Sequence, residues 1–125
     1  MKRAGLLLIV TTMLFLTACG AKDPIVGKWH ATVLYDGTDF IKYDAAAQEN
    51  IWSIFDNDGT GSQSINGSTY SLTWELYKEE ENSRSYTVTV DGLSLYFALS
   101  RDSASEPYSK AILFVEEDWC IFYEK

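Results

Sequence analysis

Hydrophobic and polar residues alternate along most of the chain after residue 25. The alternation is clearest where Tyr70, Leu72, Trp74 and Leu76 are interleaved with polar residues. Successive side chains of a β-strand point to opposite faces, so this period of two predicts strands with one buried face. The predicted strands cover residues 29–35, 51–55, 70–77, 86–90, 93–99, 111–115 and 119–123.

Short turn signals separate these strands. Asn66-Gly67 and Asp91-Gly92 are typical of type I′ hairpins, in which both central residues need positive φ. Consecutive hairpins favour an up-and-down order, and a sheet with one apolar face must close on itself or pair with another sheet. The sequence therefore predicts an all-β fold: a small up-and-down antiparallel β-barrel, or a flattened barrel, of about eight strands.

Three stretches interrupt the alternation. Residues 44–49, Asp-Ala-Ala-Ala-Gln-Glu, predict a short helix capped by Asp44. Residues 100–109 predict a loop, and residues 78–84 a charged hairpin tip. No internal repeat or second domain is visible.

The N-terminus has the three parts of a secretory signal. Lys2 and Arg3 precede a short apolar run that reaches Leu16, and two small residues lead to Cys19. The run is too short to span a bilayer, which takes roughly 20 apolar residues. A membrane-spanning anchor and an ordinary secreted protein are the weaker alternatives.

Leu16-Thr17-Ala18-Cys19 resembles the lipobox of bacterial lipoproteins. The resemblance implies that a diacylglyceryl group is attached to Cys19 and that the chain is cut just before it. We therefore expect a signal peptide over residues 1–18, a lipidated tether over 19–24 and one domain over 25–125. The acyl chains would hold that domain on the extracytoplasmic side of the cell membrane or the outer membrane.

Charge narrows the possible partners. The chain carries a formal net charge of −8, and loss of the basic residues Lys2 and Arg3 would leave −10. This charge repels phosphate backbones and argues against nucleic-acid binding. It also disfavours adsorption to anionic lipid, so we expect the acyl chains to be the sole membrane anchor. With Cys19 lipidated, Cys120 has no disulfide partner, and its strand context predicts a buried thiol.

Two further motifs resemble lipocalins and their small bacterial relatives. These are Gly27-Lys28-Trp29 at the start of the first strand and Phe55-Asp56-Asn57-Asp58-Gly59-Thr60-Gly61, and the resemblance covers most of the mature chain. It implies a lipocalin-like barrel with Trp29 plugging its closed end. The chain is shorter than a full lipocalin and lacks the family's arginine near the C-terminus, so two alternatives stay open: a hollow barrel, or a narrow barrel filled by its own side chains.

Candidate chemistry is sparse. His30 is the only histidine, and no nucleophile elbow or phosphate loop is present, so we expect no enzyme. Asp56 and Asp58 lack the spacing of a calcium loop and suit a tight turn, so we expect neither metal nor cofactor.

Aromatic residues are the remaining signal. The candidates for ligand binding are Trp29, Trp52, Trp74 and Tyr77, of which Trp52 and Tyr77 are the candidates for exposure. The leading hypothesis is a module that binds a small apolar ligand in the barrel or at its mouth. The alternative is a structural or interaction protein that meets another envelope protein and has no ligand.

Overall fold

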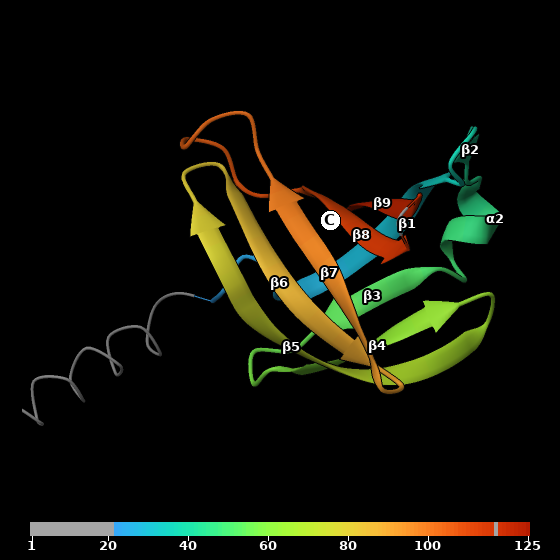
Figure 1. Cartoon of the computed structure of the whole chain (residues 1–125), viewed down its shortest axis with the longest axis horizontal. Helices are drawn as coiled ribbons and strands as arrows, with labels where there is room; N and C mark the ends of the chain where they lie inside the picture. The colour runs from blue at the N-terminus through green and yellow to red at the C-terminus, as the bar shows by residue number, and fades with distance from the viewer. Residues whose placement is uncertain (1–21, 117) are drawn as a thin grey trace, which may run out of the picture.

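A computed structural model of the chain describes residues 22–116 and 118–125, so the predicted signal peptide and Cys19 lie outside the described residues. Nine strands and one short helix follow one another along this part of the chain (Figure 1). The elements are β1 (Gly27–Tyr35), β2 (Phe40–Lys42), α2 (Ala45–Gln48), β3 (Trp52–Phe55), β4 (Thr60–Ile65), β5 (Ser68–Glu80), β6 (Ser83–Val90), β7 (Leu93–Ser100), β8 (Lys110–Glu116) and β9 (Trp119–Glu124).

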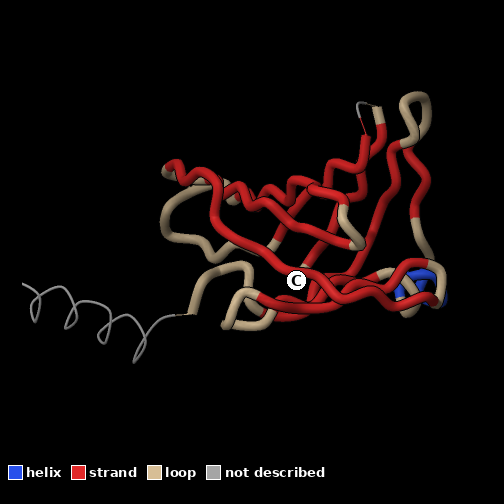
Figure 2. The backbone as a smooth tube through the Cα atoms, turned by 60° about the horizontal axis from the view of Figure 1, so that its bottom comes forward, coloured by secondary structure: helices blue, strands red, loops and turns tan. Residues whose placement is uncertain are grey.

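The strands form one closed antiparallel sheet. From β3 to β9 each strand pairs with the next in sequence, and β1 pairs with both β3 and β9. Eight strands thus make an up-and-down barrel, and β2 is an extra strand beside the last residues of β1. Strands make up most of the backbone in Figure 2, with the helix at one end. The predicted all-β barrel is confirmed.

The hairpin turns were predicted correctly because their chemistry is local. Asn66 and Gly67 have φ of 53° and 87°, and Asp91 and Gly92 have 51° and 83°. These paired positive values define the expected turns, whose twist matches that of the strands. The short helix is also confirmed, and the Asp44 carboxylate accepts a hydrogen bond from the backbone N–H of Ala47 at 2.8 Å.

Two strands were missed by the sequence analysis. Residues 60–65, Thr-Gly-Ser-Gln-Ser-Ile, carry no apolar alternation, yet they pair with β3 on one side and β5 on the other. Backbone pairing with two hydrophobic neighbours therefore makes β4 a strand. β2 has only three residues, all exposed, and it exists through its pairing with β1.

An aromatic cluster fills the barrel around Phe97, which is fully buried. Its ring centroid lies 5.6 Å from that of Trp29, 5.0 Å from that of Phe55 and 5.5 Å from that of Tyr123. Rings at these separations make favourable edge and offset contacts. This part of the interior is packed with side chains.

Candidate functional site

One end of the barrel, where β1 begins and β9 ends, is closed by Trp29. Its indole N–H donates to the carbonyl of Ile25 at 2.8 Å. The Lys125 ammonium lies 5.4 Å from the centre of the Trp29 ring and donates to the carbonyl of Pro24 at 2.8 Å. A cation above an indole face is stabilising, so Lys125 helps to hold Trp29 at this end of the barrel.

The residues before β1 are tied to this closed end by an ionic cluster, here called the Asp23 clamp. Arg84 lies 3.0 Å from the Asp23 carboxylate, and its Nε donates to the Tyr86 hydroxyl at 2.8 Å. Tyr86 also donates to Asp23, and Arg84 pairs with Glu79 on its outer side. Burial alone would lower the pKa of Arg84, but its bonds to Tyr86 and Asp23 raise it. The chain is thus fixed to β6 at Asp23.

At the opposite end, large apolar side chains remain exposed although they share the inward faces of their strands. Leu93, 65% exposed, continues the series Leu95, Phe97 and Leu99 on β7. Tyr70 on β5 and Trp119 on β9 likewise continue buried series. We call this set the apolar rim; its members are Ile41, Ile65, Tyr70, Leu93 and Trp119. The barrel therefore presents apolar surface at the end away from Trp29.

Polar side chains lie inside the barrel wall formed by β3, β4 and β9. Ser53 and Gln63 are buried, and the Gln63 amide donates to the Ser53 hydroxyl at 3.3 Å. The Tyr123 hydroxyl is buried with no hydrogen-bond partner among the described residues. Burial raises the pKa of Tyr123, and Ser53 and Gln63 lie near enough to moderate that rise. An unpaired buried hydroxyl is uncommon in folded proteins.

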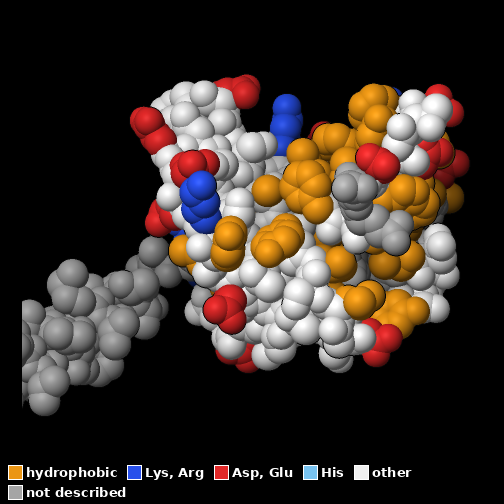
Figure 3. Space-filling model, viewed as in Figure 1, with side chains coloured by type: hydrophobic (Ala, Val, Ile, Leu, Met, Phe, Trp, Pro, Cys, Tyr) orange, Lys and Arg blue, Asp and Glu red, His pale blue; other side chains and the backbone are white. Residues whose placement is uncertain are grey.

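The outside of the barrel carries a second apolar surface, here called the outer face. It consists of two rows of directly opposed residues that cross β7, β8, β9, β1 and β2. The first row is Tyr96, Phe114, Cys120, Tyr35 and Phe40; the second is Ala98, Ile112, Phe122, Val33 and Lys42. In Figure 3, hydrophobic side chains gather on the part of the surface over β8, β9 and β2.

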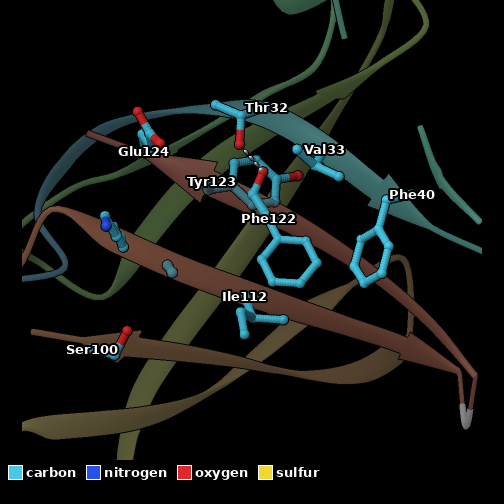
Figure 4. A pocket seen from close by; sticks show the side chains of 10 residues that line it. Thr32, Val33, Phe40, Ser100, Ile112, Phe122, Tyr123 and Glu124 are labelled. Atoms are coloured by element: carbon cyan, nitrogen blue, oxygen red, sulfur yellow. Dashed lines mark hydrogen bonds between the residues drawn. The ribbon is translucent and has the colours of Figure 1, made fainter. Parts of the chain in front are cut away.

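A groove of about 380 Å³ opens on the outer face. Figure 4 shows Phe40, Ile112 and Phe122 pointing to the same side of the sheet, while Tyr123 lies behind it. Phe40 packs against Tyr35, with ring centroids 4.7 Å apart, and reaches Phe122 at 6.2 Å. The volume is in the range of sites for small molecules.

The four aromatic candidates from the sequence do not come together. Trp29 is buried at the closed end. The Trp74 indole N–H donates to the carbonyls of Asp56 and Thr60, at the two ends of the β3–β4 turn. Trp52 is half-buried on the outside of β3, beneath the Lys28 ammonium. Tyr77 is 65% exposed and stacks on Tyr96. Only Tyr77 adjoins the outer face, and none belongs to the rim.

The cysteine prediction needs correction, because Cys120 is half-buried in the first row of the outer face. The alternation of β9 places Ile121 and Tyr123 inside, so their neighbour Cys120 points outward. Partial burial raises the pKa of the thiol, which disfavours the reactive thiolate at neutral pH.

Residues 111–115 show why the outer face was missed. In Ile112-Leu113-Phe114-Val115, apolar residues occupy both faces, so the alternation cannot identify the outward pair. A continuous apolar run, in a chain whose other strands alternate apolar and polar residues, is the signal that could have indicated an apolar outer wall.

Among residues 22–116 and 118–125, no three potential metal ligands converge. Nor does this part of the chain hold a helix of the length and hydropathy that crossing a membrane requires. No known family model, curated protein or solved structure matches the chain.

Proposed function

We propose that this protein is a lipid-anchored, non-catalytic binding protein of the cell envelope, related in design to small lipocalins. The lipobox supports anchoring through Cys19. The closed end supports the lipocalin comparison, because Trp29 and its covering cation lie where that resemblance predicts a plug.

The ligand is a small apolar or amphipathic molecule held at the apolar rim. The observation that carries this proposal is the exposure of inward-facing residues along the rim, with Leu93 65% and Tyr70 40% accessible. Apolar surface of this kind is costly to leave in water unless a ligand covers it.

The test is native mass spectrometry of protein extracted from membranes. We expect an N-terminal peptide that begins at acylated Cys19 and a non-covalent adduct on the intact domain. The variant Leu93→Glu should lose the adduct, whereas Tyr77→Glu, which changes a side chain of equal exposure outside the rim, should keep it. Adduct loss in both variants, or in neither, would place the ligand elsewhere.

A second candidate is an envelope interaction protein without a ligand. The filled aromatic interior around Phe97 favours it. If the extracted wild-type protein carries acyl chains but no adduct, this candidate replaces the first.

A further inference from the structure

We infer that the outer face rests on the lipid bilayer, so that the barrel lies along the membrane surface instead of standing away from it. This inference rests on the proposed acylation of Cys19. The inference goes beyond that acylation, because it names the surface of the domain that contacts lipid.

The first step concerns the reach of the tether. The Asp23 clamp fixes the chain to β6, with the Arg84 and Asp23 side chains only 13% and 21% exposed. Four Cα steps separate Cys19 from Asp23, so the tether spans at most about 14 Å. Opposing walls of a small β-structure lie about 10 Å apart. A domain held at its closed end by so short a tether can touch the bilayer with its side wall.

The second step concerns the chemistry of the outer face. Its exposed side chains are aromatic: Phe40 is 68%, Tyr96 49% and Phe114 45% exposed, and Tyr77 extends the face onto β5. At about 200 Å² for each ring, the four present roughly 450 Å² of apolar surface. Patches of this size on a monomer are often functional. Tyrosine in particular favours the boundary between lipid and water.

The third step concerns charge. A chain with net charge −8 is repelled by anionic lipid as a whole, which disfavours adsorption. None of the ten positions in the two rows is acidic, and Lys42 ends the second row. Lys110 lines the groove as well, where Glu124 is the one acidic residue. The two rows themselves therefore carry no carboxylate, and this face can approach lipid.

A second copy of the chain is the alternative occupant, and the crosslinking outcome of the experiment tests it. The bilayer is favoured because the tether already holds the domain beside it.

The experiment uses the full acylated protein, reconstituted in vesicles of phosphatidylethanolamine and phosphatidylglycerol at three to one. In a Cys120→Ala background, one variant carries Phe114→Cys and a matched variant carries Ser71→Cys. Ser71 is exposed on β5 and lies opposite Ser62 of β4, outside both rows of the outer face. Each thiol is labelled with bimane, and its quenching by lipids with a doxyl group near the headgroup is measured.

We expect quenching at Phe114→Cys to exceed that at Ser71→Cys by at least threefold, and circular dichroism to confirm that both variants fold. Adding Phe40→Glu should abolish the difference while the protein stays on the vesicles. Equal quenching, or stronger quenching at Ser71→Cys, overturns the inference, as does crosslinking of Phe114→Cys between two copies.

The same preparation separates failure of this inference from failure of the proposed anchor. Mass analysis of the N-terminal peptide reports acylation of Cys19 independently of quenching. An acylated protein whose outer face is not quenched refutes the orientation and leaves the anchor standing. A protein without acyl chains refutes the anchor, and the inference fails with it because the reach argument no longer holds.

Discussion

Replacing Phe97 by alanine tests whether the aromatic cluster supports the fold. Phe97 is fully buried and touches the rings of Trp29, Phe55 and Tyr123. Truncating a buried phenylalanine costs about 3–5 kcal/mol, including the cavity left behind. Each lost ring pair adds about 0.5–1.5 kcal/mol beyond burial, which favours the upper part of that range. We expect Phe97→Ala to lower the free energy of unfolding by about 4 kcal/mol.

That loss is large for a domain of this size, whose total stability is expected to be about 5–15 kcal/mol. Urea unfolding followed by tryptophan fluorescence and circular dichroism measures it, and the midpoint should fall while the slope is unchanged. Tyr96→Ala, which removes an exposed ring of the same strand, is the control and should cost less than about 1 kcal/mol. A cost below about 1.5 kcal/mol for Phe97→Ala would show that the cluster is loosely packed and would refute the reasoning.

Three further predictions concern single side chains. Gly61→Ala should lower the free energy of unfolding by about 3 kcal/mol, because the new Cβ would press on the backbone carbonyl of Ile54. Thermal unfolding measures this loss, and an unchanged melting temperature would contradict the contact. Tyr123→Phe should match or exceed wild-type stability at pH 7, because the buried hydroxyl lacks a hydrogen-bond partner among the described residues. Burial raises the pKa of Tyr123 in the folded protein, so its neutral hydroxyl contributes stability that is lost as the pH rises above about 10. The phenylalanine variant has no such group, and its urea midpoint should therefore fall less steeply above about pH 10 than that of the wild type. Lys125→Ala should lower the free energy of unfolding by about 1 kcal/mol, because the contact with Trp29 is lost, whereas Lys125→Arg should leave it almost unchanged. Urea titration measures both values, and equal losses in the two variants would exclude a cationic role.

The strands with alternating residues and the type I′ turns could be predicted from sequence, because each depends on a few neighbouring residues. Asp91-Gly92 needs only its own backbone preferences, and the two strands that it joins bury Val88 and Phe97 as their alternation requires. Strand β4 could not be predicted, since Ser62 and Gln63 gain their strand conformation from pairing with β3 and β5.

The candidate surfaces were less predictable than the fold. Leu93 follows the same alternation as Phe97, yet one is mostly exposed and the other fully buried. Their difference arises from position along the barrel axis, which depends on the stagger of all eight strands. The Asp23 clamp joins residues 61 positions apart in sequence, and no local pattern marks Asp23 and Arg84 as partners.

The pairing of β1 with β9 has a consequence for how the chain acquires its structure. The strands that close the barrel lie at opposite ends of the domain, so Ala31 meets Tyr123 only after almost every other residue has been made. Until then β1 and β8 each have an unpaired edge, and such edges invite association between chains. Contacts so distant in sequence also slow folding, because the intervening chain must be ordered first. A chain delivered from its N-terminus would therefore need protection from aggregation until β9 arrives, and removing β9 should leave an aggregation-prone sheet instead of a smaller barrel.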